Sequence, residues 1–331
     1  MDRRTFITRA PFGLLAAPRA AHAQPAARVY RVGTLSNGKT RTDAEFRQDH
    51  WALALRDLGW VEGENVAFER RYADGRVDRL PELARELVAA KVDVIATFFG
   101  TDYVAAKQAT AVIPIVMIYN GFDPVEDGLI ASYARPGGNV TGVSRMLGET
   151  DPKRLELIRE ALPLARRLAV LAPTLAAADR QAKFENRIRA AARNAPVELT
   201  FFWYGNQDEL ESTFPAMEGK GIQGFVLTPQ PYTFQSRDRI ARLAIRHRLP
   251  GVFTLREYAE AGGLMSYGPD WPLLLRQHAR YVDRILRGAS AADLPIEQPT
   301  QFEFVINLNT AAALGLKIPQ PLLLRADARV E

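Results

Sequence analysis

The sequence VYRVGTLSNGKTRTDAEFRQDHWALALRDLG, residues 29–59, decides the fold class. It begins with an apolar run, 29–36, that predicts a buried β-strand, and after a polar loop it continues with a helix-periodic stretch, 43–58. Thr42 and Glu45 match the T-x-x-E capping box, so we expect the helix to begin directly after Thr42. A buried strand followed by an amphipathic helix is the βα unit of a parallel sheet.

The same alternation of short apolar runs and amphipathic stretches continues along the chain in two series. Two series predict an α/β protein with two doubly wound parallel-sheet lobes, each covered by helices on both faces. The expected strands are residues 29–36, 65–71, 92–99, 113–119 and 140–144 in the first series and 168–172, 197–204, 222–228, 250–254 and 264–267 in the second. The expected helices include residues 43–58, 79–90, 153–162, 178–194, 237–248 and 272–288.

The chain of 331 residues, 47% of them hydrophobic, is long enough for two such domains. We expect residues 28–145 and about 270–300 to form the N-terminal lobe and residues 146–268 to form the C-terminal lobe. The remaining residues, 301–331, are expected to supply a C-terminal strand and helix near the hinge.

The first 23 residues are typical of an export signal. Adjacent Arg3 and Arg4 are followed by Phe6, as in a twin-arginine signal, and Ala21 and Ala23 match the A-x-A cleavage pattern. The apolar part between them is much shorter than the roughly 20 residues needed to span a bilayer. We therefore expect a protein that is exported, processed near position 24 and soluble in the periplasm, where there is almost no ATP.

Composition excludes several classes of function. The chain has no Cys and four His, which excludes disulfides and Cys nucleophiles and leaves little for a metal site. The net charge is +5, but the first 23 residues carry four Arg and one Asp, which leaves 39 basic and 37 acidic residues in the remainder. Because these basic and acidic residues are intermixed along the chain, we expect no nucleic-acid partner. Because Cys is absent and His is rare, we expect no metal, and we also expect no cofactor.

Two glycine-containing motifs match patterns that are found in nucleotide-binding proteins. Residues 33–40, GTLSNGKT, match the P-loop pattern, which indicates an ATPase if taken alone. In a P-loop the helix begins at the Gly-Lys-Thr itself, whereas the capping box here starts the helix later and leaves Lys39 in a loop. Gly219, Gly221 and Gly224 match G-x-G-x-x-G but precede a strand instead of following one. A P-loop ATPase or a periplasmic hydrolase therefore remains only an alternative.

Ligands of open α/β sheets bind beyond the carboxyl ends of the strands, and two facing lobes would place the site between them. Free N–H groups at a helix start, together with the Thr101 hydroxyl, suit a carboxylate, and Asp123 suits an ammonium group. We therefore expect an amino-acid-like ligand. The candidates at strand ends are Ser36, Asn37, Gly100, Thr101, Asp102, Tyr119, Asn120 and Asp123 in the first lobe and Thr174, Tyr204, Thr228, Gln230, Tyr232, Thr254, Arg256 and Glu257 in the second.

Several segments resemble the periplasmic substrate-binding proteins of ABC importers, in the branch with type I folds that binds tryptophan and other aromatic amino acids. As a set, they cover essentially all of the chain after the export signal. They are LRDLGWVEG (55–63), ADGRVDRLP (73–81), AAKQAT (105–110), IPIV (113–116), DPV (123–125), ARPGGNVTG (134–142), EAGGLMSYGP (260–269) and FVINL (304–308).

The resemblance implies two lobes joined by three crossover strands, which close on a small molecule and deliver it to an inner-membrane permease. The chain departs from the family at Phe98-Phe99-Gly100, where a small, Gly-rich turn is usual, and at the segment 119–122. The residues that the resemblance assigns to the ligand are Ser36, Thr101, Asp123, Thr174, Pro229, Gln230, Thr254 and Asp270.

These observations predict a monomeric, non-enzymatic binding protein that captures a small solute by hinge closure. A ligand-dependent partner of a membrane receptor would share the fold, and the sequence does not separate transport from sensing.

Overall fold

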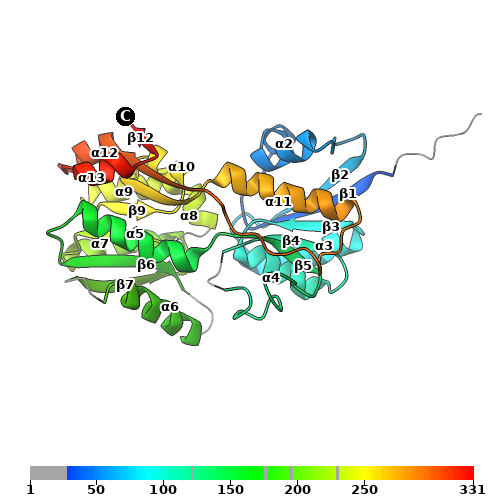
Figure 1. Ribbon diagram of the computed structural model, residues 1–331, viewed down its shortest axis with the longest axis horizontal. Helices are drawn as coiled ribbons and strands as arrows, with labels where there is room; N and C mark the ends of the chain where they lie inside the picture. The colour runs from blue at the N-terminus through cyan, green and yellow to red at the C-terminus, as the bar shows by residue number, and fades with distance from the viewer. Residues whose placement is uncertain (1–27, 121–122, 175–177, 194–196, 229–230) are drawn as a thin grey trace, which may run out of the picture.

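The computed structural model describes residues 28–120, 123–174, 178–193, 197–228 and 231–331. Two lobes lie side by side and are joined by a narrow set of connections (Figure 1). The first lobe contains a sheet of five parallel strands in the order β2-β1-β3-β4-β5. The strands are β1 (Tyr30–Ser36), β2 (Val66–Tyr72), β3 (Val94–Thr97), β4 (Ile115–Tyr119) and β5 (Val140–Ser144).

Helices cover both faces of this sheet, as expected for a doubly wound lobe. One face packs against α2 and α11, and the other packs against α3 and α4. Alternate residues of β4 serve the two faces, with Val116 on the α11 side and Met117 on the α4 side. The helices of this lobe are α1 (Asp43–Arg47), α2 (His50–Asp57), η1 (Val77–Arg79), α3 (Leu80–Ala89), α4 (Gly100–Ala109) and α11 (Trp271–Leu286).

The first helix begins where the capping box predicts. The Thr42 hydroxyl accepts from the Glu45 N–H at 3.2 Å, and the Glu45 carboxylate accepts from the Thr42 N–H at 2.8 Å. The prediction of one helix over 43–58 is wrong, however. Asp49 accepts from the Trp51 N–H at 2.9 Å and so starts a second helix, α2, because an Asp side chain offers the backbone a new N-cap.

The second lobe contains a sheet in the order β12-β11-β10-β9-β8-β6-β7. Its first five strands along the chain are parallel and repeat the strand order of the first lobe. The sheet is mostly parallel, as predicted, with one exception, since β11 runs antiparallel to β10. The strands are β6 (Arg167–Pro173), β7 (Glu198–Tyr204), β8 (Gly224–Leu227), β9 (Gly251–Phe253), β10 (Met265–Pro269), β11 (Phe302–Asn307) and β12 (Ala328–Val330).

The C-terminal segment, expected near the hinge, adds β11 and β12 to this second sheet. Two core clusters fill the faces of the sheet, one centred on Leu168 and Val170 and the other on Leu171 and Phe225. The helices are α5 (Leu147–Ala161), α6 (Ala178–Ala191), α7 (Gln207–Gly219), α8 (Pro231–Gln235), α9 (Arg237–Arg246), α10 (Arg256–Glu260), α12 (Leu308–Ala313) and α13 (Gln320–Arg325).

Three stretches of chain cross between the lobes (Figure 1). They are the link from β5 to α5, the link from β10 to α11, and the segment that leads into β11. The third crossover is hydrogen-bonded to the other two through its backbone. The Glu297 carbonyl accepts from the Ser144 N–H at 2.8 Å, and the Gln301 carbonyl accepts from the Asp270 N–H at 3.3 Å. Met146 in the first crossover has a φ of 52°, a conformation that non-glycine residues rarely adopt and that stores local strain at the hinge.

Within the described ranges, no helix is long and apolar enough to cross a membrane.

Candidate functional site

Side chains of the two lobes meet in front of the hinge. Trp271, the first residue of α11, stacks on Phe99 of the first lobe with ring centroids 6.3 Å apart. Its ring centroid also lies 6.5 Å from that of Phe234, which belongs to α8 of the second lobe. At the same junction, a methyl group added at Gly38 would lie 3.1 Å from the Gln235 amide nitrogen. The carboxyl ends of both sheets therefore border one contact zone.

In the first lobe, four predicted residues gather where the strand order reverses between β1 and β3. The buried carboxylate of Asp102 accepts from the Asn37 N–H at 3.0 Å and from the Thr101 hydroxyl at 3.2 Å. Burial raises the pKa of Asp102 to about 7, against the lowering effect of these hydrogen bonds. Ser36 accepts from the Gly38 N–H at 2.9 Å. The structure thus brings Ser36, Asn37 and Thr101 together around Asp102.

The start of α4 is already crowded. A methyl group added at Gly100 would lie 2.6 Å from the Asn120 amide oxygen, so Asn120 packs directly against the first residue of the helix. The Asp102 carboxyl lies buried within the first turn of the same helix. Because an acidic group already occupies this helix start, an added carboxylate would be repelled whenever Asp102 is ionised.

Tyr119 and Asp123 lie apart from this group. Tyr119 is fully buried on the α4 face of the sheet, where its hydroxyl donates to Asp127 at 2.6 Å. The Asp123 carboxylate accepts from the Val125 N–H at 2.7 Å and so caps its own turn. Their side chains therefore have structural partners away from Trp271.

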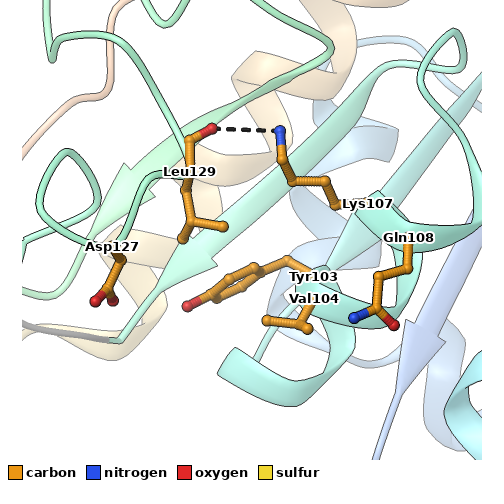
Figure 2. Close-up of a pocket in the computed structure, with 6 residues that line it drawn as sticks. All are labelled: Tyr103, Val104, Lys107, Gln108, Asp127 and Leu129. Atoms are coloured by element: carbon orange, nitrogen blue, oxygen red, sulfur yellow. Dashed lines mark hydrogen bonds between the residues drawn. The ribbon is translucent and has the colours of Figure 1, made fainter. Parts of the chain in front are cut away.

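A pocket of about 440 Å³ in the first lobe is lined in part by Asp127 (Figure 2), the residue that accepts from the Tyr119 hydroxyl. Lys107 spans its rim and donates to the Leu129 carbonyl at 3.4 Å. None of its lining residues is among those predicted to bind ligand. They are Tyr103, Val104, Lys107, Gln108, Asp127 and Leu129.

The predicted residues of the second lobe are spread along its strand ends. Thr174 follows β6 and is exposed, whereas Thr254 follows β9 and is 1% exposed, with a hydroxyl that lacks a partner among the described residues. Asp270 caps α11 by accepting from the Leu273 N–H at 2.8 Å. Pro229 and Gln230 lie outside the described residues, as does the expected export signal with Arg3, Arg4, Phe6, Ala21 and Ala23.

Sequence reasoning missed a buried group of charges at the hinge. Arg145 follows β5, is 2% exposed and holds its guanidinium carbon 5.5 Å from the centre of the Trp271 ring. In the second lobe, Glu257 is the second residue of α10, and one of its oxygens is buried without a partner among the described residues. The signal available in the sequence was the position of Arg145, directly after an apolar strand at the expected lobe boundary.

A second buried arginine lies nearby but is paired. Arg154 forms an ion pair with Asp151 and donates to the Tyr267 carbonyl at 3.0 Å. Burial lowers the pKa of Arg145 to about 10 and the pKa of Arg154 to about 9, the latter with help from the neighbouring Arg145 charge. Both groups stay cationic at neutral pH, but the Arg154 charge is neutralised by Asp151, so it is Arg145 that presents positive charge beside Trp271.

Among the described residues of this zone, no set of side chains suits a resident metal. In the part of the chain that the structure describes, no three His, Asp or Glu side chains gather closely enough to hold a metal ion. Lys39 of the P-loop-like sequence is exposed and precedes α1, so it does not lie at the start of a helix as a phosphate-binding lysine does.

Comparisons with known proteins agree with this architecture. A curated "Tyrosine-binding protein" of Clostridioides difficile (strain R20291) is 26% identical over 265 residues, which is 80% of this chain and 75% of that protein. The structure of an ABC domain in complex with L-Trp from Streptococcus pneumonia matches with a TM-score of 0.80 at 22% identity, over 91% of this chain and 100% of that one.

A ligand-free, open substrate-binding protein from Clostridium difficile matches with a TM-score of 0.64 at 21% identity, over 92% of this chain and 99% of that one. These solved structures share the two-lobed fold of periplasmic binding proteins, which confirms the predicted fold class. The family model "ABC transporter substrate binding protein" matches residues 49–330. The chain therefore belongs to the ABC transporter substrate-binding protein family.

Proposed function

We propose that this protein captures an aromatic amino acid between its lobes and hands it to an inner-membrane ABC permease. The observation that carries the proposal is the aromatic contact zone, in which the Trp271 ring contacts Phe99 of the first lobe and Phe234 of the second. Aromatic rings offer a flat ligand large apolar area and defined edge and face contacts. The relatives that bind tyrosine and L-Trp support the same ligand class.

Transport in this proposal needs binding and release, with no chemical step. Trp271 begins one of the three crossovers, and Phe99 and Phe234 reach it from separate lobes, so a ligand held among them would favour the closed arrangement. The protein would act in the periplasm as a monomer, after export directed by its first 23 residues, and would not act on nucleic acid.

The test is thermal unfolding of protein freed of carried-over ligand by denaturation and refolding. L-tryptophan, L-tyrosine and L-phenylalanine are compared with glucose, L-lysine and Mg-ATP. A ligand present at 100 times its dissociation constant adds about 2.7 kcal/mol to the unfolding free energy, which is a shift of several degrees. Stabilisation by the aromatic amino acids alone is expected. Stabilisation by glucose or Mg-ATP alone would contradict the proposal.

A matched pair of variants locates the site. Trp271→Ala should abolish the stabilisation by L-tryptophan, because it removes the ring that links the two lobes. Trp203→Ala is the control, since Trp203 packs on Phe201 and Phe184 at the edge of the second sheet, away from the hinge. Equal loss of binding in both variants would show that Trp271 has no special role.

A further inference from the structure

The hinge contains a buried donor and a buried acceptor that the fold does not use. Nε and Nη2 of Arg145, both shielded from solvent, have no hydrogen-bond partner among the described residues, and the same is true of Oε2 of Glu257. A buried charged group without partners is costly, and most such groups in proteins are satisfied. Arg154, equally buried, is paired with Asp151 and Tyr267, so burial at this hinge does not by itself prevent pairing.

Arg145 and Glu257 approach each other without forming an ion pair. The electrostatic influence between them is mutual, since each is among the groups that favour the charged form of the other. No ion pair joins these two side chains within the described part of the chain, where other arginines at the surface do pair with carboxylates. They reach this position from opposite sides, Arg145 from the first crossover and Glu257 from the start of α10.

The position of Arg145 ties this charge to the aromatic zone. Its guanidinium lies over the ring of Trp271, which in turn stacks on Phe99. A molecule held beside Trp271 would therefore meet a guanidinium with free N–H groups at one end. Planar guanidinium groups hold carboxylates by paired, charge-assisted hydrogen bonds.

We infer that Arg145 and Glu257 read the two charged ends of an α-amino acid, with Arg145 holding its carboxylate and Glu257 its ammonium group. This inference rests on the proposed function and assigns the recognition chemistry of that site. It replaces the expectation that the start of α4 holds the carboxylate and that Asp123 holds the ammonium group. The Asp102 carboxyl lies at the first of these places, and the Asp123 carboxylate caps its own turn.

Recognition of both charged ends would also couple ligand binding to closure of the lobes. The acceptor is carried by the second lobe and the donor by a crossover that leads out of the first-lobe sheet, so a zwitterion can bridge them only when the lobes approach. Burial raises the pKa of Glu257, while the Arg145 charge opposes that effect. An ammonium group placed beside Glu257 would further favour its ionised form.

The experiment measures binding by calorimetry with three probes that share an indole ring. L-tryptophan has both charges, 3-indolepropionate has only the carboxylate, and tryptamine has only the ammonium group. Wild-type protein is expected to bind L-tryptophan most tightly. Arg145→Met should weaken L-tryptophan and 3-indolepropionate by about 100-fold or more and leave tryptamine nearly unchanged, because the lost partner is a desolvated charge. Glu257→Gln should weaken L-tryptophan and tryptamine and spare 3-indolepropionate.

The control is the double variant Arg154→Met with Asp151→Asn, which removes a buried arginine and its partner together. It should keep the ranking of the three probes. Arg145→Lys is a second variant in case Arg145→Met does not fold. It keeps the positive charge but loses the paired hydrogen bonds of the guanidinium group, so it should bind L-tryptophan with intermediate affinity. Thermal unfolding without ligand checks that each variant folds.

Two negative results are distinguishable. If wild-type protein binds none of the three probes, the proposed function itself fails. If wild-type protein binds L-tryptophan and Arg145→Met or Arg145→Lys binds it equally well, the assignment of Arg145 is overturned while the proposed function stands. Equal weakening of all three probes by Arg145→Met would likewise overturn carboxylate recognition.

Discussion

Two buried polar centres of this molecule differ in whether their polar atoms have hydrogen-bond partners within the protein. Inside the first lobe, His278 of α11 accepts from the Trp51 indole N–H at 2.8 Å and lies 3.0 Å from the Val116 carbonyl, to which its other nitrogen donates. At the hinge, Arg145 is buried and Glu257 is half-buried, and each has buried polar atoms that lack partners among the described residues. The difference separates polar groups that hold the fold from polar groups kept for another molecule.

The His278 centre connects three elements. It joins α2, α11 and β4, and so it fastens the helix that leads out of the hinge to the first-lobe sheet. Burial lowers the pKa of His278 to about 4, so the ring is neutral at physiological pH and both hydrogen bonds remain in place. His278 is fully buried and therefore serves the packing of the first-lobe core.

The largest effect should come from breaking the satisfied centre. His278→Ala leaves a cavity and strands the Trp51 N–H and the Val116 carbonyl, so we expect a loss of about 3 to 5 kcal/mol in the free energy of unfolding. Urea unfolding at pH 7.5 measures it. His247→Ala is the control, since His247 lies at the end of α9 beside Glu218 and its loss should cost less than about 1 kcal/mol. Equal losses would contradict the contrast.

The next effect concerns Asp102, whose carboxyl group accepts hydrogen bonds but is costly to ionise because it is buried. Burial raises its pKa from the ordinary 3.8 to about 7 in the folded protein, so the folded state binds the proton more tightly. The contribution of Asp102 to the unfolding free energy should therefore fall as the pH rises from about 4 to 7 and then level off, while the lowered pKa of His278 acts in the opposite direction between about 4 and 6.5. Asp102→Asn cannot titrate and keeps an oxygen that can accept from Asn37.

The Asp102→Asn variant should consequently match the wild type near pH 4 and exceed it by about 2 to 4 kcal/mol at pH 8. Urea unfolding of both proteins across this range measures the difference, and the His278 titration cancels because both proteins share it. A difference that does not change with pH would show that Asp102 is not the titrating group.

The smallest effect is expected at the P-loop-like sequence. Lys39 is exposed, so Lys39→Ala should change the unfolding free energy by less than about 0.5 kcal/mol. Thermal unfolding with and without Mg-ATP should give the same curves for variant and wild type. Stabilisation of the wild type by Mg-ATP that the variant loses would restore the nucleotide-binding alternative.

Local chemistry in the sequence determined the secondary structure closely. The run at 140–144 forms β5 over the same residues, and the capping box places the start of α1 after Thr42. Such signals survive because strand burial and helix capping depend on residues within one turn or one strand. The sequence pattern did not predict the break at Asp49. Starting a second helix at this N-cap and continuing the first helix through it are too evenly balanced for the sequence pattern to distinguish.

The candidate site was predictable only where it depends on strand ends. Asn37 and Thr101 meet at Asp102 because neighbouring parallel strands deliver their carboxyl ends to one edge. That Tyr119 lies apart from this group was not predictable, because β4 is apolar on both faces and the sequence does not say which residues point toward which helix layer.

The sequence by itself determined the α/β class, the two lobes and the resemblance to binding proteins. Only the tertiary structure decided that Arg145, Glu257 and Trp271 share one place, since they stand on three separate elements far apart in the chain. The physical reason is that their meeting depends on how the crossovers set one lobe against the other. No local periodicity or capping preference carries that information.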